Sequence, residues 1–463
     1  MNRKHAIKHI PLKRVAAGLC SLVLFVQLSG CQQGETSSST SDSKESTVST
    51  GGDNVESGKN IWQNAAEAAM KDVLQNFWYQ DVENGHLIKT DHGLPMAEER
   101  QQGMMWEHAT MVFVLETYAD MTGSEEAKKR LAAQWQYTLS EFNEEKRTGL
   151  FGREPNIAAD DAGWGAMAFM AFYRATGDIQ ALKSAGELVN GAYDHWAVNG
   201  DIAQGMYYND ERRFVCTASA ASMCAGLDFY IEAQKSDSAY LKELGNTVLE
   251  KTKKLYGWMT DQMQRNGKKV YANNTITVDC DDKLFWMCVD VDEQTGSILP
   301  QGYSRPMDIR EAGSVSSLFG NMAMGIVNAK LFHITGETLY CERAVEIAKA
   351  LTASSSYNIN GCFLNDRDAW ANGSFVGAWV KEVLTLDGIT AAEIDMITNT
   401  AASIQKNCRT DKGYYRAEWL GGNAWTKATQ SMATPTVPEQ IMTTANTVHF
   451  IVAAGLAEAK NLF

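Results

Sequence analysis

Two adjacent carboxylates, Asp160 and Asp161, stand immediately before an apolar stretch that predicts a helix. The stretch is apolar on nearly every side, with Trp164 near its start, so we expect other elements to cover it all round. It ends at Gly177, where a helix C-cap is expected, and Asp178 can cap the next helix. A buried helix with two carboxyl groups at its entrance suits acid–base chemistry.

Glycoside hydrolysis is the reaction that such a pair fits best. One carboxyl group protonates the leaving oxygen, and the other attacks the sugar or activates water. Adjacent aspartates at a helix entrance can hold their carboxyl groups about 5 Å apart, the spacing of retaining enzymes. Mutual repulsion would raise one pKa, leaving an acid and a base at neutral pH. A structural alternative stays open on spacing alone: one Asp caps the helix, and the other is a surface charge that favours the helix dipole.

Other chemistries find less support in the sequence. There is no G-x-S-x-G, H-E-x-x-H, Walker A or G-x-G-x-x-G motif. The eight histidines are scattered, and we expect His108 to be packed rather than catalytic. No cofactor and no metal site are therefore expected. The acidic insertion at 266–309 lacks the EF-hand spacing, so a solvated insertion is favoured over a calcium loop.

The elements that position the pair follow a helical repeat from about residue 60 to the end. An aromatic residue followed by a Thr-Gly turn recurs at Thr122, Thr176 and Thr335, separated by 54 residues and then by 159, three times 53. A period in the fifties is typical of a repeated helical hairpin. Amphipathic helices with charged faces are expected at 124–141, 238–256, 337–351 and 391–406. Helices that are apolar all round are expected at 104–118, 162–173, 216–230, 315–330 and 375–386.

This alternation predicts the architecture. The charged helices form an outer layer, and the apolar ones form an inner layer in which small residues allow close approach. About twelve helices, from near Ile61 to near Ala459, give two concentric layers of six. The fold class is therefore all-α, an (α/α)6 barrel of six helical hairpins over residues 59–463.

In such a barrel the loops before the inner helices converge on one cleft. Besides the Asp pair, these loops supply aromatic rings that can cover apolar sugar faces and polar groups that can fix hydroxyls. The candidate sugar-binding residues are Trp106, Glu107, Trp164, Tyr207, Tyr208, Asn209, Trp370 and Phe375. For any one of the aromatics, ordinary core packing is the alternative.

The N-terminus reads as an export signal. Residues 1–30 contain five basic residues and no acidic residue, and the basic residues all precede an apolar stretch. Leu-Ser-Gly-Cys follows this stretch and resembles a bacterial lipobox. We expect a lipoprotein signal peptide at 1–30, lipidation at Cys31, and a flexible Ser/Thr-rich tether at 31–58. The expected location is an exported protein, lipid-anchored at the bacterial membrane or cell surface.

Charge excludes one class of partner. The 463-residue chain carries −14, and without the five basic groups of the signal about −19 remains. Nucleic acid binding depends on basic contacts, so we expect no nucleic acid partner. The expected partners are a polysaccharide or oligosaccharide substrate and the membrane through the lipid, with the protein a monomer. Seven cysteines remain beyond Cys31, an odd number without C-x-x-C, and most are expected to be buried.

The motif Asp-Asp-x-x-Trp, the apolar helix and Tyr-Arg-Ala-Thr-Gly-Asp, over 160–178, resemble glycoside hydrolase family 76, the endo-α-1,6-mannanases. The segment 204–209, Gln-Gly-Met-Tyr-Tyr-Asn, is similar to that family's Gly-Gly-x-x-Trp-x segment. The family's second Trp after the pair is Gly165 here, and its Phe-Lys-Gly signature is Phe-Val-Gly at 375–377.

The resemblance implies an (α/α)6 barrel and a retaining hydrolase of α-1,6-mannosidic bonds. It assigns Asp160 as nucleophile and Asp161 as general acid/base, with Trp164, Tyr207 and Tyr208 lining sugar subsites. Two alternatives remain. Another barrel enzyme, an unsaturated glucuronyl hydrolase or a sugar epimerase, should show basic residues or catalytic histidines at the cleft, where only Arg310 and His108 are candidates. A glycan-binding lipoprotein should bind sugar without either aspartate.

Overall fold

The computed structural model describes residues 60–79, 85–87, 105–140, 158–209, 212, 214–270, 277–292, 317–365, 371–421 and 440–463. The chain divides into two units, 1–56 and 57–463, and every described residue belongs to the second. The signal peptide, the tether and lipidation at Cys31 fall outside the described residues and stay predictions. Within the ranges that the structure describes, no helix combines the length and hydropathy needed to span a membrane.

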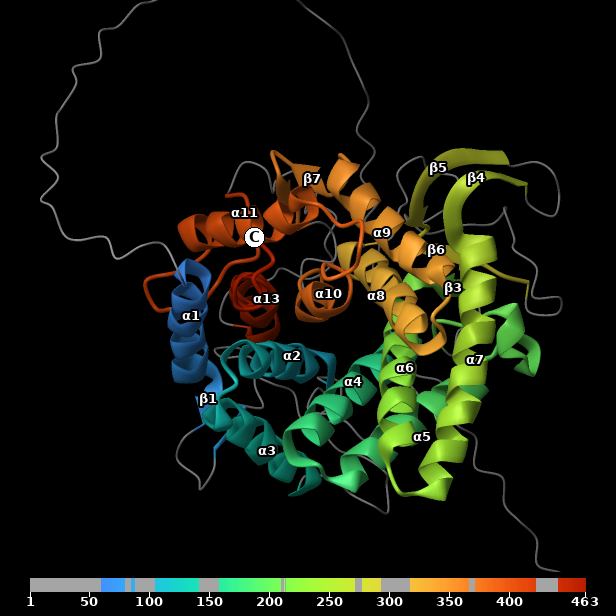
Figure 1. Ribbon diagram of the computed structural model, residues 1–463, viewed down its shortest axis with the longest axis horizontal. Helices are drawn as coiled ribbons and strands as arrows, with labels where there is room; N and C mark the ends of the chain where they lie inside the picture. The colour runs from blue at the N-terminus through green and yellow to red at the C-terminus, as the bar shows by residue number, and fades with distance from the viewer. Residues whose placement is uncertain are drawn as a thin grey trace, which may run out of the picture. The chain divides into compact units, whose positions relative to one another are not determined.

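The inner layer is a closed ring of helices (Figure 1). Each inner helix contacts the next, and the last contacts the first. In order they are α2 (Met105–Thr122), α4 (Ala159–Thr176), α6 (Ala220–Lys235), α8 (Leu318–Thr335), α10 (Val376–Glu382) and α13 (Ile441–Ala459).

The outer helices alternate with the inner ones along the chain and lie outside the ring. They are α1 (Ile61–Phe77), α3 (Glu125–Ser140), α5 (Ile179–Trp196), α7 (Ala239–Met263), α9 (Thr338–Ala353) and α11 (Ala391–Asn407). The described residues thus hold twelve α-helices, beginning at Ile61 and ending at Ala459. The predicted (α/α)6 barrel is confirmed.

Small residues let the inner helices approach closely. A Cβ on Gly163 of α4 would lie 2.3 Å from the backbone nitrogen of Ser222 on α6. A Cβ on Gly377 of α10 would lie 2.0 Å from Oγ1 of Thr117 on α2. Any larger side chain at either position would force the helices apart, so glycine is what sets these interhelical spacings.

The Thr-Gly turns end inner helices as the repeat predicts. Gly123, Gly177 and Gly336 have φ values of 62°, 69° and 74°, a left-handed conformation that glycine adopts without strain. The N–H of Gly177 donates to the carbonyl of Tyr173 at 2.7 Å. Asp178 then accepts from the N–H of Gln180 at 2.9 Å and caps α5, as expected.

The described residues also form four short antiparallel strand pairs. They are β1 (Trp78–Tyr79) with β2 (His86–Leu87), β3 (Phe214–Cys216) with β6 (Cys288–Asp290), β4 (Gln264–Val270) with β5 (Thr277–Phe285), and β7 (Asn358–Ile359) with β8 (Cys362–Phe363). The same part of the chain contains the 3₁₀ turns η2 (Val198–Gly200), η3 (Ile202–Gln204) and η4 (Thr217–Ser219). Part of the acidic insertion thus forms a β-ribbon rather than an irregular loop.

Several predicted helix boundaries are wrong: the helix expected to end at 256 runs to Met263, and the helix expected to end at 330 runs to Thr335. For two others the hydrogen bonds show the cause. The helix expected from Cys216 begins only at Ala220, because Cys216 belongs to β3 and the N–H of Thr217 donates to the carbonyl of Met287 at 2.9 Å. The helix expected to reach residue 386 ends at Glu382. There the N–H groups of residues 383 and 384 both donate to the Trp379 carbonyl, so the regular bonding pattern stops.

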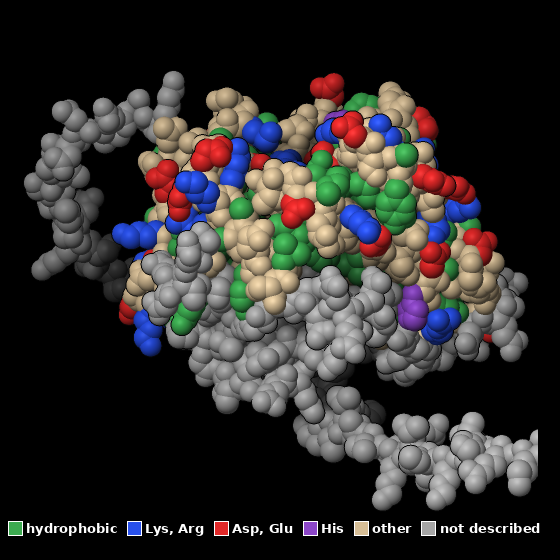
Figure 2. Space-filling model, turned by 90° about the horizontal axis from the view of Figure 1, so that it is seen from below, with side chains coloured by type: hydrophobic (Ala, Val, Ile, Leu, Met, Phe, Trp, Pro, Cys, Tyr) green, Lys and Arg blue, Asp and Glu red, His purple; other side chains and the backbone are tan. Residues whose placement is uncertain are grey.

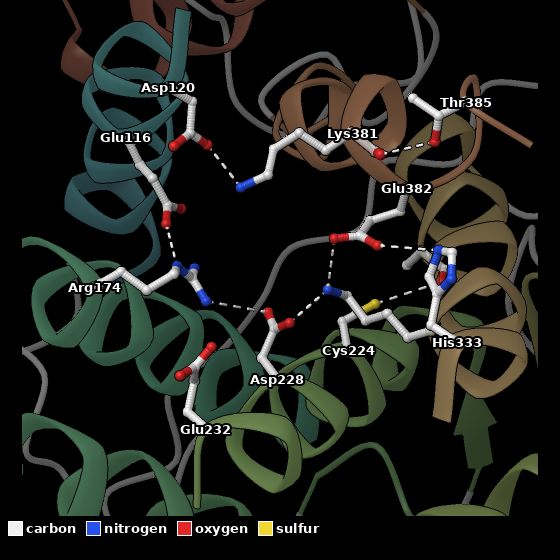
Figure 3. A network of polar contacts seen from close by, with 12 residues as sticks. Glu116, Asp120, Arg174, Cys224, Asp228, Glu232, His333, Lys381, Glu382 and Thr385 are labelled. Carbon is white, nitrogen blue, oxygen red and sulfur yellow. Dashed lines mark hydrogen bonds and ion pairs between the residues drawn. The ribbon is translucent and has the colours of Figure 1, made fainter. Parts of the chain in front are cut away.

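A network of ion pairs joins the C-terminal halves of five inner helices (Figure 3). Arg174 of α4 contacts Glu116 of α2 at 2.5 Å and Asp228 of α6 at 3.8 Å. Lys330 of α8 contacts Asp228 and, at 3.2 Å, Glu382 of α10. We call these five residues the charged ring. Acidic and basic groups alternate along the row from Glu116 to Glu382, so every member has an opposite charge on at least one side.

Burial and pairing act in opposite directions on the charged ring. Burial alone would raise the pKa of Asp228, but Lys330 and Arg174 together hold it below its usual value. Burial likewise opposes the charge on Lys330, yet Asp228 and Glu382 raise its pKa. A second pair, Lys381 with Asp120 at 2.6 Å, links α10 to α2. The ring is a paired cluster, in which removing one member leaves another charge without its partner.

The outer surface carries both signs of charge. On the face shown in Figure 2, Lys and Arg side chains are interspersed with Asp and Glu side chains over the described part of the surface. They do not gather into one basic area on this face.

Candidate active site

Both aspartates lie in the first turn of α4, and neither caps it. The N-cap is Ala158, whose backbone is extended and whose side chain cannot accept a hydrogen bond. Asp160 is only 3% exposed, and Asp161 is half-buried. The alternative in which one Asp caps the helix and the other is a surface charge is therefore wrong. Asp160 is a buried carboxyl group that no capping role explains.

Two other segments hold the entrance of α4 in place. The N–H of Ala159 donates to the carbonyl of Tyr208 at 2.7 Å. The hydroxyl of Ser222, on α6, donates to the carbonyl of Ala159 at 2.5 Å. The two residues that hydrogen-bond to the backbone of Ala159 thus come from the segment after α5 and from the next inner helix. The position of the carboxyl pair is fixed by tertiary contacts as well as by the helix itself.

The segment that carries Tyr207 and Tyr208 folds back on the end of α5. The N–H of Tyr207 donates to the carbonyl of Trp196 at 2.7 Å, and Val198 donates to Gly205 at 3.0 Å. Gly205 has a φ of 111°, and a Cβ there would lie 3.2 Å from the ring of Trp258. Glycine is required at this return, which explains why the predicted motif contains it.

Tyr208 reaches Asp160 directly. Its hydroxyl donates to Oδ2 of Asp160 at 3.5 Å, and the N–H of Asp161 donates to Oδ1 of Asp160 at 3.1 Å. Burial raises the pKa of Asp160 to about 6, against these hydrogen bonds, which favour the charged form. The negative charge of Asp160, together with burial, raises the pKa of Tyr208 well above its usual value. Burial, not repulsion between the two aspartates, is thus the main cause of the raised carboxyl pKa.

Trp164 and Phe375 lie in an aromatic cluster at the centre of the ring. Trp164 is 1% exposed and lies 5.4 Å from Phe375 between ring centroids, in an edge-to-face arrangement. Phe113 and Phe319 complete the cluster, at 6.1 Å and 5.9 Å from Trp164. These contacts give both predicted residues a packing role inside the ring of inner helices, and contact with sugar stays a prediction.

The remaining candidates divide into described and undescribed residues. Tyr207 is buried, and Asn209 is half-buried, with its carbonyl accepting from the N–H of Arg212 at 3.0 Å. The side chains of Trp106 and Glu107, at the start of α2, and all of Trp370 lie outside the described residues. Their predicted role in binding sugar is untested.

Sequence reasoning missed the residues that position the pair. Ser222 and Gly163 appear in an apolar, small-residue pattern that predicted only helix packing. Tyr208 was expected to line a subsite, and its contact with Asp160 was not foreseen. The only sequence signal for Tyr208 was its place in the segment 204–209, which predicted that it lies near the Asp pair but not that it contacts Asp160. No property of a lone Ser in an inner helix indicates that it will meet the entrance of the neighbouring helix.

A groove elsewhere on the barrel does not contain the pair. It has a volume of about 700 Å³ and runs beside α1, where it is lined by Glu67, Met70, Lys71, Leu74, Gln75, Trp78, Tyr79, Tyr118 and Arg130. None of the candidate residues borders it, so the chemistry of the Asp pair, rather than the volume of a pocket, identifies the site. Among the residues described, no three His, Cys, Asp or Glu side chains cluster in a way that could hold a metal ion. His108 is fully buried in α2.

Comparisons with known proteins agree with the fold. No protein-family model matches the chain, and no curated protein matches it in sequence. Among solved structures, the family 76 α-1,6-mannanase of Salegentibacter sp. HEL1_6 is similar over 86% of this chain and 99% of its own, with 17% identity and a TM-score of 0.59. A family 76 glycoside hydrolase (mannosidase) from Bacteroides thetaiotaomicron VPI-5482 shares 14% identity over 86% and 99% of the chains, with a TM-score of 0.58.

A third neighbour is an unsaturated glucuronyl hydrolase specific for heparin, at 13% identity, a TM-score of 0.53, and coverage of 86% and 98%. Similarity at these identities establishes the shared barrel. The predicted resemblance to family 76 is confirmed at the level of the fold.

Proposed function

We propose that this chain is a retaining glycoside hydrolase that cleaves α-1,6-mannosidic linkages in mannan-type polysaccharides. The observation that carries the proposal is the carboxyl pair at the entrance of α4, with Asp160 buried and a raised pKa, in a barrel similar to those of family 76 mannanases. Among the described residues Asp160 has no ion pair, and a buried carboxyl group with a raised pKa is typical of an active site.

The solved neighbours support the choice of these residues. For the Salegentibacter enzyme, variants with two adjacent aspartates changed to asparagine or alanine are described as inactive and bind α-1,6-mannotriose or α-1,6-mannotetrose. An adjacent pair of aspartates is also what this chain presents at an inner-helix entrance. We infer that the two pairs perform the same task.

In the proposed mechanism, Asp160 attacks the anomeric carbon and Asp161 protonates the leaving oxygen, then activates the water that releases the product. A nucleophile must be ionised. With a pKa of about 6, Asp160 is charged in about nine of ten molecules at pH 7. The Tyr208 hydroxyl and the Asp161 N–H stabilise this charge, and attack on the sugar removes it from a buried site. Burial therefore favours the step that forms the glycosyl-enzyme.

Turnover of linear α-1,6-mannan tests the proposal. The full chain should release mannooligosaccharides, and Asp160→Asn and Asp161→Asn should each lower kcat by at least about a thousandfold. Asp237→Asn, a change of an exposed aspartate in the turn between α6 and α7, should leave the rate unchanged. NMR of the first product should show the anomer of the substrate retained.

The same assay separates the alternatives. No turnover, with mannan binding unchanged in both Asp variants, would replace the hydrolase proposal by a glycan-binding protein. Turnover of an unsaturated uronide instead of mannan would favour the glucuronyl hydrolase alternative. The burial of His108 makes that alternative weaker, because this histidine is fully enclosed in the ring.

We further propose that the protein is exported and held at a membrane surface by lipid on Cys31. The lipobox-like sequence after an apolar stretch supports this location. Cys31→Ser should move the protein from the membrane fraction to the soluble fraction without changing turnover of soluble mannan. Retention of the variant in the membrane fraction would contradict lipid anchoring.

A further inference from the structure

Two cysteines face each other across the strand pair β3–β6. The strands are antiparallel, with Phe214 opposite Asp290 and Cys216 opposite Cys288. These strands lie far apart in sequence, so the apposition of the two cysteines is a product of the fold. Both residues are thiols in this structure.

The hydrogen bonding fixes the geometry of the pair. The N–H of Thr217 donates to the carbonyl of Met287 at 2.9 Å, which makes Thr217 and Met287 a hydrogen-bonded pair. In an antiparallel ladder the next pair is then non-hydrogen-bonded, with Cα atoms about 4.5 Å apart and side chains on the same face. Disulfides span Cα distances of about 4.4 to 6.8 Å. Cys216 and Cys288 therefore stand at a spacing that a disulfide can bridge with little backbone movement.

The other described cysteines lack such a partner in the strand ladders. Cys224 lies on α6, Cys341 on α9 and Cys408 after α11. In the strands, Cys280 of β5 stands opposite Gly267, and Cys362 of β8 stands opposite Ile359. Register thus singles out Cys216 and Cys288 among the cysteines within the described ranges.

We propose that Cys216 and Cys288 form a thiol–disulfide site, which closes to a cross-strand disulfide when an external disulfide compound oxidises it. The thiolate of one cysteine attacks a sulfur of that compound and releases one thiol. The second cysteine then attacks the mixed disulfide and releases the other thiol. Two protein thiols are thereby oxidised, and one external disulfide is reduced to two thiols.

Access requires a brief opening of the strand pair. Cys216 is 4% exposed and Cys288 is 5% exposed, so neither sulfur is reached in the closed state. The ladder spans only three residue pairs, and a two-stranded ladder of this length is held by few hydrogen bonds. We expect oxidation to be slow and to follow the opening of β3 from β6.

The site adjoins the candidate active site along the chain. Cys216 lies between Tyr208, which contacts Asp160, and Ser222, which holds the Ala159 carbonyl. A disulfide to Cys288 would fix this segment to β6 and close a large loop of the chain. Cross-linking distant residues restricts the unfolded state, so the oxidised protein should unfold at a higher temperature than the reduced protein.

The test oxidises the full chain with glutathione disulfide and maps the products. After alkylation and proteolysis, mass spectrometry should find the peptides containing Cys216 and Cys288 joined, with the loss of two hydrogens. The midpoint of thermal unfolding should rise by several degrees and return after dithiothreitol. Amide hydrogen exchange over residues 214–219 should slow in the oxidised form.

Two variants show whether the cross-link and the rise in unfolding temperature depend on this cysteine pair. Cys288→Ala should abolish both the cross-link and the oxidation-dependent rise in unfolding temperature, whereas Cys362→Ser should leave both intact. Cross-linking of wild type is read directly, so a variant that folds poorly does not obscure the answer. Cys216 and Cys288 that remain separate after prolonged oxidation, or that pair with other cysteines, would overturn the proposal. None of these readouts depends on hydrolase activity.

Discussion

Replacing Asp160 with asparagine should stabilise the protein while abolishing turnover. Burial raises the pKa of Asp160 from 3.8 to about 6. A shift of about two units corresponds to roughly 3 kcal/mol, which is the free energy that the folded state loses by keeping this group ionised. Asparagine has a similar shape and carries no charge, so Asp160→Asn should raise the free energy of unfolding by up to about 3 kcal/mol at pH 7.5.

The stability difference between wild type and Asp160→Asn should depend on pH. Because the folded pKa is the higher one, the destabilisation is complete above about pH 6, shrinks as the pH falls, and is absent below 3.8. Urea unfolding of wild type and Asp160→Asn from pH 4 to 7.5 measures the difference. Other carboxyl groups cancel in this comparison because both proteins contain them.

The neighbouring aspartate supplies the control. Asp161→Asn removes a negative charge from the first turn of the same helix, where such a charge favours the helix dipole. This variant should therefore lose about 0.3 to 1 kcal/mol. If Asp160→Asn is no more stable than wild type at pH 7.5, or if its advantage does not change with pH, burial is not what raises the pKa of Asp160.

Three further predictions follow from contacts in the structure. Tyr208→Phe removes a hydrogen bond to ionised Asp160, so the acid limb of the kcat/KM profile should move to higher pH, by about one unit or less; an unchanged limb would exclude that contact. Lys330→Met leaves the buried Asp228 without its partner and should lower the free energy of unfolding by about 3 to 5 kcal/mol. In a double-mutant cycle, adding Asp228→Asn should recover part of this loss, and kcat of the folded protein should stay unchanged. Gly163→Ala should lower the free energy of unfolding by about 1 to 3 kcal/mol and also reduce kcat, because it pushes α6 away from α4; wild-type values in both assays would contradict the close approach.

The barrel could be predicted because its signals are local and repeated. The Thr-Gly turn after inner helices places a left-handed residue where each helix must stop, as at Gly177 and Gly336. The alternation of apolar and charged helices specifies which layer each one joins. The predicted start of the inner helix at Cys216 was wrong because that residue pairs with a distant strand. Cys216 has no local reason to leave a helix, and only its partner strand, some seventy residues later, shows why it does.

The candidate site was partly predictable for a different reason. Two adjacent carboxylates before an apolar helix are visible in the sequence, and so is the segment that holds Tyr208. Burial of Asp160 and the contact from Tyr208 depend on how three separate segments meet. The charged ring was missed although its members recur at about the helical repeat: Arg174 precedes Asp228 by 54 residues, and Lys330 precedes Glu382 by 52. A charged residue at the same level of successive apolar helices is a signal of such a ring.

The two charged clusters occupy different ends of the same helix, and their chemistry differs accordingly. Asp160 and Arg174 are separated by about 21 Å along α4, at 1.5 Å per residue. At the Arg174 end, opposite charges are paired, which ties five inner helices together. At the Asp160 end, the buried carboxyl group accepts hydrogen bonds but has no ion pair among the described residues. The desolvation cost of its charge is therefore not fully offset, and its pKa is raised. The buried charges at one end are compensated by partners, whereas the carboxylate at the other end keeps its desolvation penalty, which is the arrangement that a buried nucleophile requires.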